Sequence, residues 1–136
     1  MEATLPGNNK SILIVDDDSQ IVRLVSEILA GQGFDIITSG SGEDALKKSK
    51  GFEGEIALLL TDFEMPGISG IELATRLTEL RPNIKVLLMS GFDGGMLVLN
   101  EGWHFLPKPF VASQLRGLVS GLVYPNKRFL ATEPPL

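Results

Sequence analysis

Hydrophobic residues along the 136-residue chain follow two alternating patterns. Residues 11–15 and 56–61 form short, nearly continuous apolar runs, which are typical of strands buried on both faces. Residues 19–33 instead carry apolar side chains three and four positions apart, which indicates a helix with one buried face. These two patterns predict buried strands that alternate with amphipathic helices.

The alternation continues as far as residue 123. Further strands are predicted at residues 34–38, 84–90 and 103–109, and further helices at residues 42–50, 71–80 and 111–123. Strands that alternate with helices favour a parallel sheet, because parallel neighbours need a crossover connection, and right-handed crossovers dominate. We therefore predict a doubly wound α/β fold with a five-stranded parallel sheet and helices on both faces.

Capping residues predict where three of the helices begin and end. Ser19 is the predicted N-cap of the first helix, which should stop at Gly31 or Gly33. Ser41, followed three residues later by Asp44, resembles a capping box. The last helix follows Val111, where Ser, Thr or Asp would be the ordinary residue, so we expect a weaker cap there.

The composition restricts the partners and the location. A net charge of −5 and a pI near 4.8 disfavour direct binding to nucleic acid, because such surfaces are usually basic. The chain has no cysteine and therefore no disulfide or thiolate metal site. Its first ten residues lack the features of a signal peptide, and no apolar run has the length of a membrane span. We expect one cytoplasmic domain without membrane insertion.

Charged and hydroxyl side chains follow the ends of several predicted strands. Asp16–Asp18 follow the first strand, Asp62 the third, Ser90 the fourth and Lys108 the fifth. The carboxyl ends of parallel strands meet at one edge of a sheet, so these groups should converge. Carboxylates without histidine or cysteine favour Mg²⁺, and a lysine and a hydroxyl beside the ion would stabilise a phosphoryl group. The pattern predicts phosphoryl transfer to a carboxylate nucleophile.

Each of these residues also has an ordinary structural interpretation. A lone Asp at a strand end is most often a turn or N-cap residue, and Asp18, next to Ser19, fits that description. Ser90 alone would be a turn hydroxyl, and Lys108 alone a solvated surface charge. The occurrence of acids, a hydroxyl and a lysine at the ends of different strands of one sheet favours the functional interpretation.

Four segments resemble a known family in their order and their residues. They are ILIVDDDSQIVRLV (12–25), LLLTDFEMPGISGIEL (58–73), KVLLMSGF (85–92) and FLPKPF (105–110). Together they resemble the signature segments of response-regulator receiver domains of two-component signalling, which have a flavodoxin-like fold. The resemblance implies a receiver domain at residues 10–123, a flexible N-terminal segment at 1–9 and a C-terminal tail or linker at 124–136.

The resemblance also implies a role for several residues of the predicted site. Asp62 is the expected phosphoacceptor, and Asp16 and Asp17 form an acidic pocket for Mg²⁺. Asp17 is expected to bind the ion directly and Asp16 through water. Glu64 would offer its backbone carbonyl to the metal, and its side chain would tune hydrolysis of the acyl phosphate. In this family such receivers catalyse their own phosphotransfer and autodephosphorylation.

Further residues match the family's conformational switch. Lys108 is the expected partner of the phosphate, and the Lys108–Pro109 peptide bond is typically cis in such proteins. Ser90 and Phe105 would be the switch hydroxyl and the switch aromatic residue. The implied partners are a histidine kinase or a histidine phosphotransfer domain as donor, and a downstream protein that recognises the switched conformation.

One stretch departs from the family pattern. Between Ser90 and Lys108 the chain is about one helical turn shorter than is usual for receivers. Gly94 and Gly95 lower the helix propensity of this stretch. We therefore expect a shortened fourth helix. In this respect the chain resembles receivers attached to hybrid sensor kinases.

Two alternatives belong to other functional classes. Asp16 and Asp18 after a first buried strand also resemble the start of haloacid-dehalogenase-type phosphatases, in which Asp16 would be the nucleophile and Asp18 the acid or base. The second alternative is a binding module with a receiver fold that is never phosphorylated and acts through a static surface. Substitution of Asp62 distinguishes these possibilities from a phosphorylated receiver.

Overall fold

Strands and helices alternate along the chain as predicted. The computed structural model describes residues 9–91 and 102–125. Its strands are β1 (Ser11–Val15), β2 (Asp35–Ser39), β3 (Ile56–Asp62), β4 (Lys85–Ser90) and β5 (Trp103–Pro107). Its helices are α1 (Ser19–Ala30), α2 (Gly42–Gly51), α3 (Gly70–Leu80) and α4 (Ala112–Val123). The predicted shortened helix between β4 and β5 falls on residues 92–101, outside the described residues.

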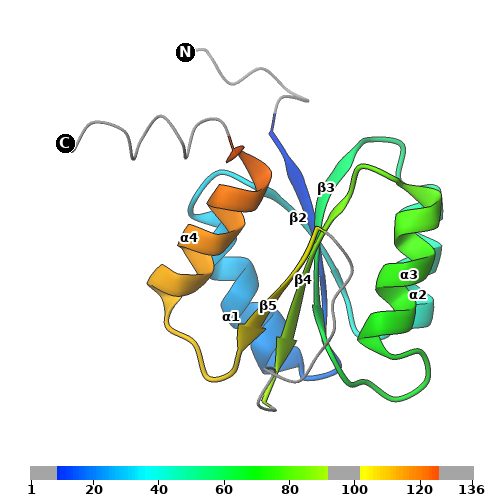
Figure 1. The fold of residues 1–136 in the computed structure, drawn as a ribbon, viewed down its shortest axis with the longest axis horizontal. Helices are drawn as coiled ribbons and strands as arrows, with labels where there is room; N and C mark the ends of the chain where they lie inside the picture. Colours follow the sequence, from blue (N-terminus) through cyan, green and yellow to red (C-terminus); the bar gives the residue numbers. More distant parts are fainter. Residues whose placement is uncertain (1–8, 92–101, 126–136) are drawn as a thin grey trace.

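The five strands form one parallel sheet in the order β2-β1-β3-β4-β5. Helices α1 and α4 cover one face of the sheet, and α2 and α3 cover the other (Figure 1). This arrangement confirms the predicted doubly wound fold. Because strand order reverses between β1 and β3, the carboxyl ends of these two strands are where a ligand site is expected.

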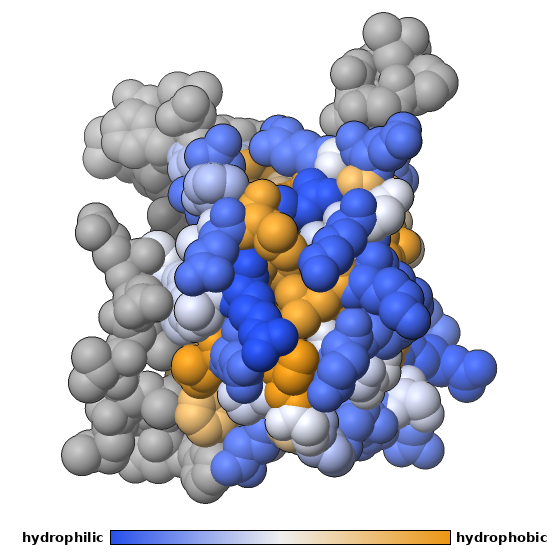
Figure 2. All heavy atoms as spheres, turned by 90° about the vertical axis from the view of Figure 1, so that its right-hand side faces the viewer, coloured by the Kyte–Doolittle hydropathy of each residue, from blue (hydrophilic) through white to orange (hydrophobic). Residues whose placement is uncertain are grey.

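Alternate residues of the central strands supply two apolar layers. Leu13, Val15 and Leu59 face α2 and α3, whereas Ile14 and Leu60 belong to the layer beneath α1 and α4. All five side chains are fully buried. Figure 2 shows the α2–α3 face, where hydrophobic side chains lie in the seam between hydrophilic ones. Burial on both faces explains why β1 and β3 read as continuous apolar runs.

Local polar contacts define the helix starts. Asp18, and not Ser19 as predicted, is the N-cap of α1, and its carboxylate accepts a hydrogen bond from the Gln20 N–H at 2.9 Å. Ser19 is already the first helical residue, because the carboxylate one position earlier reaches the free N–H groups. Ser41 caps α2 as predicted. Val111 has no side-chain acceptor, which confirms the weaker cap of α4.

The remaining predicted helix ends also agree with the structure. α1 ends at Ala30, and Gly31 is its C-cap, as the sequence indicated. Gly33 follows with a positive φ of 94°, a backbone conformation that glycine adopts without strain. Within the part of the chain that the structure describes, no helix is long and apolar enough to cross a bilayer.

Candidate functional site

The central strands bring Asp16 and Asp62 together. Val15 at the end of β1 pairs with Thr61 of β3, so Asp16 and Asp62, one residue further along, leave neighbouring strands side by side. The side chain of Asp16 is 1% exposed and that of Asp62 is 14% exposed. The apolar strands thus hold two carboxylates at the edge of the core, as the convergence of strand ends predicted.

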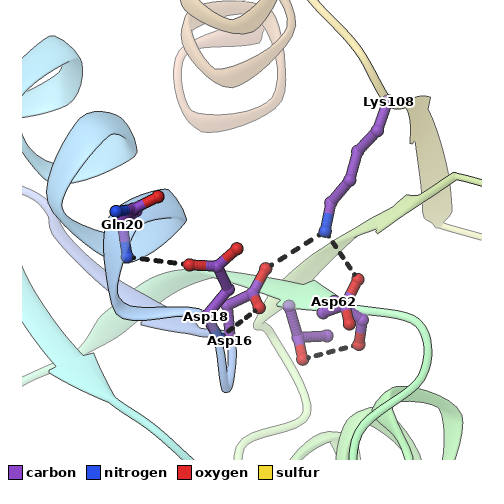
Figure 3. Close-up of polar contacts among 6 residues, drawn as sticks. Asp16, Asp18, Gln20, Asp62 and Lys108 are labelled. Atoms are coloured by element: carbon purple, nitrogen blue, oxygen red, sulfur yellow. Dashed lines mark hydrogen bonds and ion pairs between the residues drawn. The ribbon is translucent and has the colours of Figure 1, made fainter.

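Lys108 enters the same site from β5. Its Nζ lies 3.0 Å from Asp62 Oδ1 and 3.3 Å from Asp16 Oδ2 (Figure 3). The backbone N–H of Lys108 donates to the Ser90 carbonyl at 2.7 Å, and the Lys108–Pro109 bond is cis, as the family resemblance implied. One ammonium group therefore bridges both carboxylates. No local sequence pattern predicts its contact with Asp16.

Burial and charge act in opposite directions on Asp16. Burial is the largest influence and raises the pKa of its carboxyl, and the nearby Asp62 charge adds to this effect. The hydrogen bond from the Asp18 N–H, 2.9 Å from Asp16 Oδ1, and the charge of Lys108 work against it, but the net pKa is raised. Without another cation, ionisation of Asp16 therefore lowers the stability of the folded state.

Lys108 responds in the opposite sense to the same surroundings. Burial favours the neutral amine, but the hydrogen bond and charge of Asp62 and the charge of Asp16 outweigh it, so the pKa of Lys108 is raised. Lys108 thus stays a cation at neutral pH. A protonated lysine against two carboxylates can meet the negative charge of a phosphoryl group that reaches Asp62.

The acidic residues could hold a divalent cation. One carboxylate oxygen from each of Asp16, Asp17 and Asp62 lies within 4.8 Å of the other two. All three donors are oxygens, and Asp17 is exposed, so water could complete the coordination of an ion bound here. This donor set fits Mg²⁺, which takes few carboxylates and keeps several water ligands.

Other predicted residues surround Asp62. A surface pocket beside the carboxylate is lined by Glu64, Ser90, Gly91 and Lys108 together with Asp62. Ser90 ends β4 and is 3% exposed. The structure thus brings the predicted hydroxyl and lysine to the acid, and places Glu64 at the rim.

Phe105, the predicted switch aromatic residue, lies within β5. It pairs with Leu88 of β4 and packs against the apolar layer beneath α2 and α3. Its neighbour Leu106 points to the opposite layer. Phe105 is therefore two strand positions before Pro107, the partner of Ser90, and does not line the pocket around Asp62.

The loop from β3 to α3 is tightly packed beneath the site. The Phe63 N–H donates to the Met89 carbonyl at 2.7 Å, and the Gly70 N–H donates to the Phe63 carbonyl at 3.0 Å. A Cβ at Gly70 would collide with the backbone carbonyl of Asp62, and Gly67 has a positive φ of 78°. Both glycines of this turn are thus required, one for close approach and the other for its conformation.

Comparison with known families agrees with this geometry. The family model of the response regulator receiver domain matches residues 12–120. The chain belongs to this family. It is a receiver domain of two-component signal transduction, with the fold that its sequence resemblance implied.

Two curated relatives illustrate the match. The chain is 36% identical over 83 residues to the response regulator receiver protein CpdR of Brucella abortus, which covers 61% of this chain and 68% of CpdR. It is 31% identical over 119 residues to PhoP of Bacillus subtilis, a transcriptional regulatory protein of alkaline phosphatase synthesis. That match covers 85% of this chain and 49% of PhoP, so the receiver spans about half the length of that relative.

A solved receiver provides a structural comparison. TrrA of Thermotoga maritima, solved in complex with Mg²⁺ and BeF, is 34% identical to this chain, with a TM-score of 0.72. The match covers 83% of this receiver and 98% of that chain. The same protein has also been solved in complex with the histidine kinase ThkA.

The dehalogenase-type alternative disagrees with these findings. That interpretation needs Asp16 as a free nucleophile and Asp18 as acid or base. In the structure the Asp16 carboxylate is buried against Lys108, and the Asp18 carboxylate caps α1. The family match and these contacts together assign the site to a receiver.

Proposed function

We propose that Asp62 of this receiver accepts a phosphoryl group from a phosphohistidine of a histidine kinase or a histidine phosphotransfer domain. The observation that carries this proposal is the position of the Asp62 carboxylate, which lies among Asp16, Asp17 and Lys108 at the carboxyl edge of the sheet. We take residues 10–123 as the receiver unit, with 1–9 and 124–136 outside it.

In the proposed reaction a carboxylate oxygen of Asp62 attacks the phosphorus in line with the histidine nitrogen. The oxygen–phosphorus bond forms, the phosphorus–nitrogen bond breaks, and its electron pair returns to the imidazole. Asp16, Asp17 and Asp62 would hold Mg²⁺, which neutralises charge on the transferring group when it is bound. The protein itself contributes position and electrostatics: β3 fixes the nucleophile, and Lys108 stabilises the negative charge.

The acyl phosphate would then change the contacts of the pocket. It adds about two negative charges beside Lys108 and near the Ser90 hydroxyl, both of which line the pocket. We infer that Ser90 moves toward the phosphoryl oxygens and that Phe105 shifts into the space released. This is a population shift between two packings, which a downstream protein partner detects. Hydrolysis of the acyl phosphate, tuned by Glu64, returns the receiver to its first state.

The comparisons support this proposal in two respects. TrrA was solved with Mg²⁺ and BeF and, separately, with a histidine kinase. The described residues of this chain offer the all-oxygen cluster and the lysine that such chemistry needs. Both the family and the local geometry therefore support phosphoryl transfer.

The direct test is phosphorylation by a small phosphodonor with Mg²⁺. Wild-type protein should gain the mass of one phosphoryl group, and Asp62→Asn, which keeps the shape of the side chain, should gain none. If the substituted protein is labelled equally well, Asp62 is not the acceptor. If neither protein is labelled and BeF with Mg²⁺ causes no spectral change, the static binding module is the better description.

Two neighbouring acids provide a matched test of the metal ligands. Asp17 belongs to the carboxylate cluster, whereas Asp18 caps α1. Asp17→Asn should weaken Mg²⁺ binding at least tenfold, because a charged ligand is lost, whereas Asp18→Asn keeps a good N-cap and should bind Mg²⁺ like the wild type. Calorimetric titration with Mg²⁺ measures both. Equal affinity in the two variants would contradict the proposed ligand set.

A further inference from the structure

The first turn of α2 lies beside both loops that carry the proposed metal ligands. This turn comprises Gly42, Glu43 and Asp44, just after the Ser41 cap. On one side the turn contacts Ser39 at the end of β2, and the Ser39 carbonyl accepts a hydrogen bond from Asp16, the residue that follows β1. On the other side it packs against the loop that follows Asp62. No residue of this turn belongs to the carboxylate cluster itself.

Ser39 connects the turn to Asp16. The Asp16 N–H donates to the Ser39 carbonyl at 3.2 Å, which extends the β1–β2 pairing one residue beyond Val15. Ser39 is 4% exposed, and its hydroxyl lies 2.8 Å from Asp44 Oδ2 and 2.9 Å from the Ser41 carbonyl. The α2 turn therefore fixes the residue whose carbonyl holds the backbone of Asp16.

Lys48 strengthens the same connection. Its Nζ lies 3.1 Å from Asp44 Oδ2 and donates to the Thr38 carbonyl at 2.6 Å. The hydrogen bond from Ser39, followed by that from Lys48, lowers the pKa of Asp44, so Asp44 remains an acceptor at neutral pH. A charged acceptor is well suited to hold the Ser39 hydroxyl in one orientation.

Close packing connects the turn to the loop that follows Asp62. A Cβ at Gly42 would come within 2.8 Å of Ile68 Cβ and 3.2 Å of the Ile68 carbonyl. A Cβ at Gly67 would come within 2.6 Å of a carboxylate oxygen of Glu43. The turn and the loop are thus in close contact, and at Gly42 there is no room for another methyl group, whereas the exposed Glu43 side chain beside Gly67 can move aside. This loop includes Glu64, whose backbone carbonyl is a metal ligand expected from the family resemblance.

We propose that the first turn of α2 is a positioning element for the metal site, which holds the Asp16 backbone through Ser39 and the loop after Asp62 through the contact of Gly42 with Ile68. The inference depends on the proposed Mg²⁺ function. Residues that orient metal ligands without touching the ion commonly change metal affinity by ten- to a hundredfold when they are substituted. The α2 turn contacts Ser39, which is bonded to Asp16, and the loop that follows Asp62, so its displacement should alter the spacing of the ligands.

The first test uses two glycines of the same helix. Gly42→Ala pushes on Ile68, whereas Gly51→Ala, at the other end of α2, meets no atom within 4 Å. Both changes add the same methyl group. We expect Mg²⁺ affinity, measured by calorimetry without any phosphodonor, to fall about tenfold in Gly42→Ala and to stay at the wild-type value in Gly51→Ala.

The second test is a double-mutant cycle on the Ser39–Asp44 hydrogen bond. Asp44→Ala leaves the Ser41 cap intact, because that cap uses the backbone N–H of Asp44. Ser39→Ala, Asp44→Ala and the double substitution should each lower Mg²⁺ affinity by a similar factor, since either change removes the same contact. The Glu72–Arg76 pair of α3, about half exposed, is the matched control, and its removal should leave affinity unchanged.

The outcomes separate this inference from the proposed function. If wild-type protein shows no saturable Mg²⁺ binding, the proposed function fails. If wild type binds Mg²⁺ and both Gly42→Ala and the Ser39–Asp44 variants bind it equally well, the positioning role is wrong. Circular dichroism checks folding of each variant, and should Gly42→Ala not fold, the small substitution Ser39→Ala decides the question.

Discussion

The central and edge strands of the sheet contribute differently to the site. In β1 every residue is buried, and β3 is buried along most of its length, whereas in β2 and β5 one residue each is buried. The central strands carry Asp16 and Asp62. The edge strands carry the groups that contact these acids: the Ser39 carbonyl from β2 and the Lys108 ammonium after β5.

This difference indicates how the domain keeps buried carboxylates in place. Charge near a core is unfavourable unless it is paired, so the acids require strands that cannot shift and partners that can approach them. Burial on both faces makes the central strands rigid. The edge strands are more exposed, and their ends bring polar and charged partners to the acids.

The largest expected effect is a truncation in a central strand. Leu60→Ala in β3 removes a fully buried side chain and should lower the free energy of unfolding by about 2–5 kcal/mol. Ile36→Ala in β2 faces the same apolar layer from a partly buried position, and should cost less than half as much. Urea denaturation measures both. Equal losses would show that the edge is as tightly packed as the centre.

Removal of the bridging cation should come next in size. Lys108→Met keeps most of the side-chain volume but leaves Asp16 and Asp62 without their shared partner. Lys108 is 24% exposed, so solvent moderates the effect, and we expect a loss of about 1–2 kcal/mol in metal-free buffer. Saturating Mg²⁺ should restore more stability to the variant than it adds to wild type. If saturating Mg²⁺ stabilises both proteins equally, Lys108 and Mg²⁺ do not neutralise the same carboxylates.

A smaller effect concerns Asp16 and acid. Because the pKa of Asp16 is raised above 3.8, the folded state binds more protons than the unfolded state in the range just above that value. This contribution therefore favours the folded state at low pH and is lost as pH rises through the folded pKa. Asp16→Asn should remove this pH dependence. Without Mg²⁺, the stability of the variant relative to that of wild type should therefore be greater at neutral pH than at acid pH. Thermal unfolding between pH 3 and 7 measures it.

The smallest effect concerns Asp44, whose contribution to stability should depend on pH in the opposite direction to that of Asp16. Asp44, which contacts the end of edge strand β2, has a lowered pKa because of its hydrogen bonds with Ser39 and Lys48. Its contribution is present above pH 3.8 and is lost as pH falls through the folded pKa. The stability difference between wild type and Asp44→Ala should therefore shrink on acidification. A difference that is constant from pH 2 to 7 would contradict the charged Ser39–Asp44 contact.

Residues with strong local signals were predicted correctly. The apolar runs of β1 and β3 and the Ser41 cap follow from neighbouring residues alone, and the structure confirms them. Ser19 was predicted as the N-cap of α1 and Asp18 as a turn or N-cap residue, and the structure selects Asp18, because two adjacent residues can both cap a helix and only the path of the chain decides between them. For distant segments, the sequence predicted that the groups at the strand ends converge, but not which of these groups contact one another.

The sequence by itself determined the order of strands and helices, the doubly wound fold and the residues at the strand ends, because apolar periodicity and parallel crossovers are local or topological properties. Only the tertiary structure decided that Lys108 bridges Asp16 and Asp62, and that the α2 turn lies against both loops of the site. These contacts join residues far apart in the chain, and their distances depend on how the whole sheet and its helices pack.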